Sequence, residues 1–231
     1  MFKNEKNVNY VEASGKIVGI GRDDYGRKRL VLFIRGYQQR RPIYASFAIG
    51  KDVNIDFKVE DNVVIKGRII AYLFENELWN GRTTYTQYLV ADSVVSDETE
   101  LKRAFGVDGG FAYKDPYIRV YLRGEVIKKT INEQAGWINF ILRIPNETGK
   151  TNEVRLQFSK KMRVNDVEFE EGDEMVVFGT MSSKRKNING QVRSFEDFIV
   201  DDMVKIEKQE DKNIEEKPEE EVGINVEEIT Q

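Results

Sequence analysis

The chain has 231 residues, of which 40% are hydrophobic, so it can form two domains of ordinary size, each with its own core. It contains neither cysteine nor histidine, which excludes disulfides, thiol nucleophiles and imidazole bases or metal ligands. Carboxylates are left as possible metal ligands, and serine, lysine and acidic residues as possible catalysts. The composition therefore favours a protein that is not an enzyme, with no cofactor and no metal site.

The charge is unevenly distributed along the chain. The formal net charge is −4, but residues 207–231 hold ten acidic and three basic side chains, which leaves +3 for residues 1–206. We expect residues 207–231 to form a disordered acidic tail, because they lack aromatic residues and apolar periodicity. The start, MFKNEKN, has no apolar leader, and no run of eighteen apolar residues occurs. A cytoplasmic protein without a membrane partner is expected.

The sequence contains an internal repeat. NGRTTYTQYLVADSVV (80–95) aligns without a gap with NGQVRSFEDFIVDDMV (189–204). Other segments align at nearly the same offset: VEASGKIVGI (11–20) with VYLRGEVIKK (120–129), RLVLFIRG (29–36) with WINFILRI (137–144), and FKVEDNVVIKGRII (57–70) with FEEGDEMVVFGTMS (169–182). We predict two domains, 8–97 and 117–206, joined by a linker, 98–116, that carries the turn signals FGVDGG and DP. DETELKRAF (97–105) predicts a short helix beside this linker.

Within each copy the apolar residues recur with a period of two. Ile138, Phe140, Leu142 and Ile144 fall on one face of a strand, and Leu30, Leu32 and Ile34 do the same in the first copy. Five such strands occur in each copy, separated by turn-forming segments that include two NG hairpin turns. The pattern predicts an all-β protein with two small five-stranded Greek-key barrels.

The ordered set of these segments resembles a known family. GDEMVVFGTMSSKRKNINGQVRSFEDFIVDDMV (172–204) is similar to the last two strands of single-stranded DNA-binding proteins with the OB fold, and VYLRGEVIKK and WINFILRIP look like their first two. The first copy follows the same outline more loosely. The resemblance implies two tandem OB folds that bind single-stranded DNA, without sequence preference, in replication, recombination or repair.

Two features depart from the bacterial members of that family. Those members carry a helix between the third and fourth strands, whereas here only GKDVNID (50–56) or KKMRVND (160–166) intervenes. Their acidic tails end in proline and phenylalanine and recruit partner proteins, whereas this tail ends EEITQ. Two barrels in one chain with a divergent tail suit a phage or mobile-element member, which would work in the host cytoplasm.

Binding of single-stranded DNA needs cations along the phosphates and exposed aromatic faces for the bases. Both residue types gather on the first hairpin, the second and third strands and the last long hairpin of each copy. In the first copy the candidates are Arg22, Tyr25, Arg27, Lys28, Arg29, Phe33, Arg35, Arg40, Arg41, Tyr44, Phe74, Trp79, Arg82 and Tyr85. In the second they are Lys128, Lys129, Trp137, Arg143, Arg155, Lys160, Lys161, Lys184, Arg185, Lys186, Arg193 and Phe195.

The two copies differ in the balance of these residues. The long hairpin of the first copy is aromatic and that of the second is basic. This predicts that the first copy stacks on more bases and that the second neutralises more phosphates. The alternation along their strands places Phe47 and Phe158 on the core-facing side, so we expect them in the cores. Trp137 fits either the binding groove or the end of its barrel, and the run Lys184–Lys186 also fits an ordinary solvated surface.

Other functions remain open at the level of sequence. An RNA-binding OB protein would use the same residue types, and a protein-interaction module of a replication or recombination complex would use the barrel surfaces without nucleic acid. The acidic tail fits three roles: a solubilising end, a competitor for the basic groove, or a docking segment for replication or recombination proteins. Either a monomer or a homodimer is compatible with two barrels in one chain.

Overall fold

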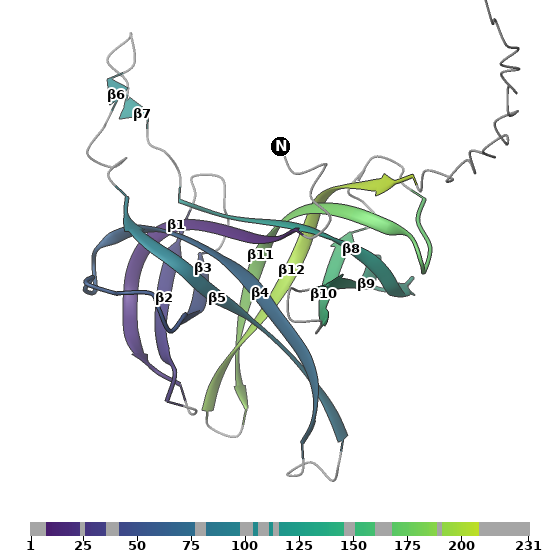
Figure 1. Cartoon of the computed structure of the whole chain (residues 1–231), viewed down its shortest axis with the longest axis horizontal. Helices are drawn as coiled ribbons and strands as arrows, with labels where there is room; N and C mark the ends of the chain where they lie inside the picture. Colours follow the sequence, from purple (N-terminus) through teal and green to yellow (C-terminus); the bar gives the residue numbers. More distant parts are fainter. Residues whose placement is uncertain are drawn as a thin grey trace, which may run out of the picture.

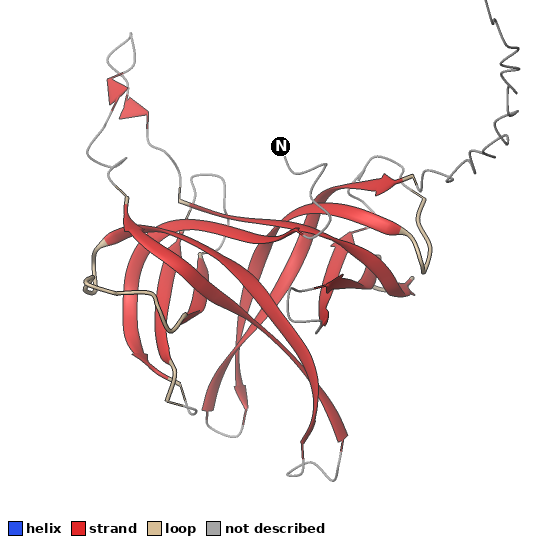
Figure 2. Cartoon of the chain, viewed as in Figure 1, coloured by secondary structure: helices blue, strands red, loops and turns tan. Residues whose placement is uncertain are grey.

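The computed structural model of the chain describes residues 8–23, 26–35, 42–76, 82–97, 104–105, 111–112, 116–145, 151–159, 168–188 and 191–207. Every regular element in these ranges is a β-strand (Figure 2). The strands belong to one ten-stranded sheet and a separate two-stranded hairpin. The prediction of an all-β protein is confirmed.

The first copy forms a closed barrel of five strands: β1 (Val8–Arg22), β2 (Lys28–Ile34), β3 (Ile43–Ile49), β4 (Asn62–Asn76) and β5 (Arg82–Ser96). Their order is β1-β2-β3-β5-β4, and β4 pairs back onto β1 to close the barrel. β3 and β5 pair in parallel and the other neighbours are antiparallel. This is the Greek-key order of a five-stranded OB barrel.

The second copy repeats this arrangement with β8 (Tyr117–Asn132), β9 (Trp137–Pro145), β10 (Thr151–Ser159), β11 (Glu174–Ile188) and β12 (Gln191–Ile206). Their order is β8-β9-β10-β12-β11, with β11 pairing back onto β8 and a parallel pair between β10 and β12. The two barrels lie side by side, and the hairpins β4–β5 and β11–β12 extend beyond them (Figure 1).

Irregularities in the strands also recur at equivalent positions. The ladder of β1 shifts between Ile17 and Gly19, and that of β8 between Val126 and Lys128. The ladders β4–β5 and β11–β12 shift immediately before Gly67 and Gly179, which the sequence repeat had aligned. β-bulges of this kind bend a strand and increase its twist, which lets a short sheet close into a barrel. The repeat therefore encodes the curvature of each barrel as well as its core.

The two barrels are joined by β1 and β8, which pair antiparallel along the top of the molecule in Figure 1. Val11 pairs with its own counterpart, Val120, at the centre of this ladder. On either side the pairs are reciprocal: Val8 pairs with Arg123, and their counterparts Tyr117 and Ser14 pair with each other. The seam therefore has local two-fold symmetry, like the interface of a homodimer made within one chain.

A carboxylate is held between two tyrosines on the outer face of this seam. The hydroxyl of Tyr10 donates to Glu12 Oε2 over 2.7 Å, and the hydroxyl of Tyr117 donates to Glu12 Oε1. Burial alone would raise the pKa of Glu12, but these two hydrogen bonds hold it below its ordinary value. Burial and the neighbouring Glu12 raise the pKa of Tyr10 to about 12, so both phenols remain donors at neutral pH. The cluster ties β1 to β8.

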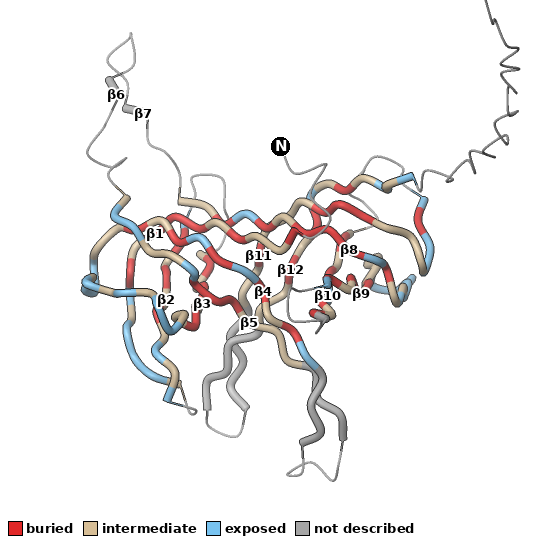
Figure 3. Tube along the Cα trace, in the orientation of Figure 1, coloured by how far each residue is buried: buried red, intermediate tan, exposed pale blue. Residues whose placement is uncertain are grey.

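The alternation predicted from sequence corresponds to the observed burial. Leu30, Leu32 and Ile34 point into the first barrel and are fully buried, as are Phe140 and Leu142 in the second. Buried residues occur along the strands of both barrels (Figure 3). Phe47 is 0% and Phe158 6% exposed, which confirms their assignment to the cores.

The C-terminal end of the helix predicted in the linker is a β-strand in the structure. Ala104 and Phe105 form β6 (Ala104–Phe105), which pairs with β7 (Phe111–Ala112), so they are not helical. Isolated helices this short are marginal because nucleation is costly, and a Phe105–Phe111 cross-strand pair offers the alternative. Residues 98–103 lie outside the described residues. Residues 50–61, between β3 and β4, form turns and coil without a helix, as their sequence indicated.

In the described ranges, no helix of membrane-spanning length and apolarity occurs. The expected acidic tail, residues 207–231, lies outside them except for Glu207.

Candidate nucleic-acid interface

The outer face of β2 and β3 carries two aromatic candidates of the first barrel, Phe33 and Tyr44. Phe33 and Tyr44 are cross-strand partners, and their rings lie 5.4 Å apart, edge to face at 66°. Both residues are half-buried, whereas their neighbours Ile34 and Ile43 turn into the core. Side chains alternate across a strand, so an inward Ile43 places Tyr44 on the outer face. The two rings form a step on which an unpaired base could stack.

Two arginines beside this step are held by an acidic residue and a tyrosine. Arg27 Nε lies 2.8 Å and Arg29 Nε 3.2 Å from Asp23 Oδ2. Their guanidinium carbons lie 4.8 Å and 5.6 Å from the ring centre of Tyr88. One carboxylate faces two guanidinium groups here, so the local charge stays positive, and the arrangement fixes the orientation of both cations.

Sequence reasoning missed Tyr88. Its signal was the alternation on β5: Leu89 is fully buried, so Tyr88 must point outwards, beside the first hairpin. Tyr72 on β4 packs against it, with ring centres 6.3 Å apart at 90°. The aromatic surface of the first barrel therefore extends from β2–β3 onto the hairpin β4–β5.

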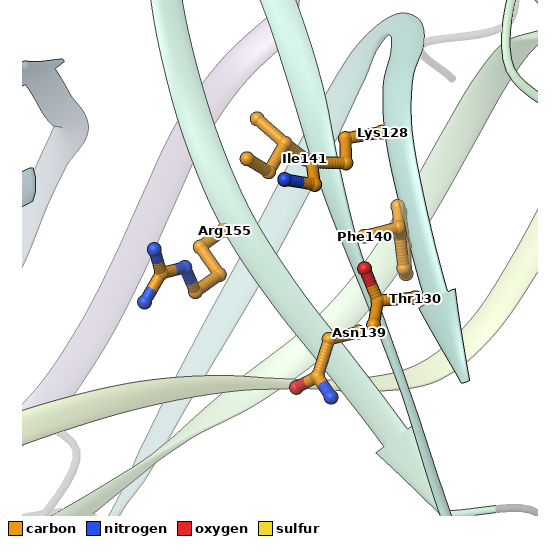
Figure 4. A pocket seen from close by; sticks show the side chains of 6 residues that line it. All are labelled: Lys128, Thr130, Asn139, Phe140, Ile141 and Arg155. Carbon is orange, nitrogen blue, oxygen red and sulfur yellow. The ribbon is translucent and has the colours of Figure 1, made fainter. Parts of the chain in front are cut away.

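The corresponding face of the second barrel is cationic. Lys128, Ile141 and Arg155 form one row across β8, β9 and β10, and Thr130 and Asn139 belong to the next row. These five residues and Phe140 line a pocket of about 260 Å³, shown in Figure 4. Phe140 is the aromatic residue among them, and only 1% of it is exposed. The pocket thus offers two cations and polar groups, but no open ring.

Two other candidates of the second barrel have acidic neighbours. Arg143 Nη2 lies 3.5 Å from Glu153 Oε1. Lys129 Nζ donates to the carbonyl oxygen of Phe169 over 2.6 Å and lies 3.0 Å from Glu170 Oε1. Their charges are partly compensated locally.

For the remaining candidates the structure gives only solvent exposure, only a position in a strand, or no description. Arg22, Lys28 and Arg35 are exposed at the ends of β1 and β2, and Trp137 is half-buried at the start of β9. Eight candidates lie on the hairpin strands without described side chains: Phe74, Arg82, Tyr85, Lys184, Arg185, Lys186, Arg193 and Phe195. Outside the described residues are Tyr25, Arg40, Arg41, Trp79, Lys160 and Lys161.

The two faces meet where the hairpins cross. Glu196 on β12 accepts a hydrogen bond from the backbone N–H of Ser46 over 3.4 Å, and its own carbonyl accepts one from Gln87 Nε2 over 3.3 Å. Burial between these elements raises the pKa of Glu196 to about 7, against the attraction of Arg29. Neither Gln87 nor Glu196 was a candidate from sequence, because their hydrogen-bond partners lie 68 to 150 residues away.

These features define the class of fold: two OB barrels in tandem, with aromatic and cationic outer faces joined by crossing hairpins. The chain is similar in structure to the single-stranded DNA binding protein from Thermus aquaticus, in a deletion variant (TM-score 0.56, 15% identity, 93% of this chain and 99% of that one) and in wild-type form (TM-score 0.55, 14% identity, 88% and 95%). The expected tandem OB fold is confirmed. No protein-family model and no curated protein sequence matches the chain.

Proposed function

We propose that this protein binds single-stranded DNA without sequence preference, as a coating protein in replication, recombination or repair. The observation that carries the proposal is the pair of outer barrel faces, one with the Phe33–Tyr44 step and one with the Lys128–Arg155 row. Aromatic steps accept any base and cations accept any phosphate, so neither element reads sequence. The structural similarity to a protein named for single-stranded DNA binding supports this choice. Residues 8–97 and 117–206 would be the two binding domains.

A titration with oligo(dT) of several lengths tests the proposal. Trp79 and Trp137 are the tryptophans of the chain, and their fluorescence should be quenched as the oligonucleotide binds. Binding should weaken steeply as salt rises, because bound cations release counterions from the strand. A parallel titration with oligo(U) separates DNA from RNA preference. A protein that neither quenches nor shows salt-dependent binding does not have this function.

Removal of one ring from the aromatic step should weaken binding strongly. Phe33→Ala or Tyr44→Ala is expected to reduce affinity for oligo(dT) about 5- to 150-fold, the loss of about 1–3 kcal/mol of stacking on one base. Val95→Ala is the control, since Val95 is 51% exposed near the end of β5, off this face. Equal affinities of all three variants would show that the step does not contact DNA.

The cationic row should contribute to the salt dependence rather than to stacking. The double variant Lys128→Ala/Arg155→Ala should lower the slope of log affinity against log salt by about 1–2 units. The matched control is Lys129→Ala/Arg143→Ala, which also removes two positive charges, but from residues that do not line the pocket. If both double variants lower the slope equally, total charge rather than the Lys128–Arg155 row governs binding.

A further inference from the structure

Each long hairpin is anchored on the third strand of the other barrel. Ser183 on β11 accepts a hydrogen bond through Oγ from the backbone N–H of Tyr44 on β3, over 3.0 Å. In the opposite direction, Gln87 on β5 accepts one through Oε1 from the backbone N–H of Arg155 on β10, over 3.1 Å. The strand pairs β3–β11 and β4–β10 are also in contact. The hairpins therefore cross, as Figure 1 shows.

The third strands have backbone groups available for these contacts. The parallel ladder between β3 and β5 spans Phe47–Ile49, so the N–H groups of Tyr44 and Ser46 lie before it begins. The ladder between β10 and β12 starts at Leu156, one residue after Arg155. Backbone donors at such a gap need a partner. Side chains from the opposite hairpin supply it in both barrels.

The exchange is reciprocal between equivalent strands, although the donors differ by two positions: Gln87 accepts from Arg155, whereas Glu196 accepts from Ser46, two residues after Tyr44. Phe47 and Phe158 occupy the same position in the two ladders, which makes Tyr44 the counterpart of Arg155. Gln87 and Glu196 are counterparts in the gap-free alignment of the two hairpins. Each of these two residues accepts a backbone hydrogen bond from the third strand of the opposite barrel. The two hairpins are therefore exchanged in both directions, in the same sense as the two-fold seam of β1 and β8 but without its exact residue correspondence.

Because of this exchange, each barrel face lies next to a hairpin that carries the other type of DNA-binding residue. The first barrel's face has the Phe33–Tyr44 step, and the hairpin anchored on it carries Lys184, Arg185, Lys186 and Arg193 in its strands. The second barrel's face has the Lys128–Arg155 row, and the hairpin anchored on it carries Phe74 and Tyr85 in its strands. A face and the opposite hairpin together hold both residue types that single-stranded DNA needs.

We infer that each strand-binding surface of this protein is composite, built from the face of one barrel and the hairpin of the other. The inference rests on the proposed function, because it names which parts of the chain share one segment of bound DNA. It adds to the division of labour expected from sequence: the basic hairpin of the second copy serves the aromatic face of the first, and the aromatic hairpin of the first copy serves the cationic face of the second. One strand crossing a composite surface meets aromatic and cationic groups from copies that are far apart in the chain.

Double-mutant cycles in the full chain test which hairpin shares DNA with which face. Tyr44→Ala should be coupled in its effect on oligo(dT) affinity to Lys184→Ala/Arg185→Ala/Lys186→Ala, with a deviation from multiplicative losses of at least about threefold. The matched cycle pairs Tyr44→Ala with Phe74→Ala/Tyr85→Ala on the hairpin of its own copy, and those losses should multiply. Stronger coupling within a copy, or no coupling in either cycle, overturns the inference.

A cross-link provides a second test that does not depend on deleting contacts. The chain has no cysteine, so Ser46→Cys/Glu196→Cys introduces a single pair across β3 and the opposite hairpin. Oxidation by oxidised glutathione should close an intramolecular disulfide, and affinity for oligo(dT) should stay within about threefold of that of the same reduced protein. Failure to close, or loss of binding on closure, overturns the inference. If the unmodified protein binds no oligo(dT), the proposed function fails, while disulfide closure still reports the exchange.

Discussion

Gly67→Ala and Gly179→Ala are each expected to destabilise the protein by about 3 kcal/mol, the upper end of the range for overpacking. A Cβ at Gly67 would lie 2.0 Å from the carbonyl oxygen of Val90, and one at Gly179 would lie 2.2 Å from that of Ile199. Both obstacles are backbone atoms of the neighbouring strand, which cannot rotate away. Each glycine follows a bulge where the strand bends towards its partner, so the fold itself requires the close approach.

Gly21→Ala is the matched control. Gly21 also lies in a strand, β1, but a Cβ there would meet no atom within 4 Å. Its replacement should change the free energy of unfolding by no more than about 0.5 kcal/mol. Urea denaturation followed by circular dichroism measures all three variants. Similar midpoints for Gly67→Ala and Gly21→Ala would show that the barrel can open at the bulge without loss.

Glu196→Gln is expected to stabilise the folded protein at pH 8 and to leave it unchanged at pH 4.5. Burial raises the pKa of Glu196 from 4.5 to about 7, so the folded state holds this proton more tightly than the unfolded chain does. The stability that the protonated form contributes is complete below pH 4.5 and is lost as pH rises through 7. A shift of this size corresponds to a loss of about 3 kcal/mol.

Glutamine is a suitable replacement because it is already present at the equivalent position of the first copy, Gln87. Its side-chain oxygen can accept the hydrogen bond from the backbone N–H of Ser46 that Glu196 accepts. The stability of both proteins is measured by denaturant unfolding from pH 4.5 to 8, with Glu125→Gln, at an exposed position, as the control. Parallel pH profiles for the wild-type protein and Glu196→Gln would contradict the assignment of pKa 7 to this carboxyl group.

The glycine variants and Glu196→Gln also separate effects on folding from effects on DNA binding. Gly67 and Gly179 lie away from the aromatic step and the cationic row, so their replacement should lower stability without a specific effect on salt dependence. Glu196 lies at the hairpin crossing, where it accepts a hydrogen bond from the backbone of Ser46 and attracts Arg29, one of the proposed DNA-binding cations. Loss of that negative charge in Glu196→Gln should strengthen binding of oligo(dT) at pH 8, since a carboxylate near Arg29 offsets the positive charge that attracts the phosphates.

The local sequence pattern was sufficient to predict the strands and many of the candidate site residues. Alternation placed Leu30, Leu32 and Ile34 inside and Phe33 outside, because the direction of a side chain in a strand depends only on its phase. The prediction of a short helix was wrong at Ala104 and Phe105. The secondary structure of so short a segment depends on its pairing partner, here the strand Phe111–Ala112.

The sequence by itself determined two tandem five-stranded barrels, their cores and the equivalent glycines at their bends, because a period of two and an internal repeat are local signals. The tertiary structure alone decided that the barrels join through β1 and β8, that Tyr88 lies over Arg27 and Arg29, and that Glu196 is enclosed at the hairpin crossing. Tyr44 and Ser183 are 139 positions apart, and no local pattern links them. The exchange of hairpins between faces depends on such distant contacts, so it became visible only in the folded chain.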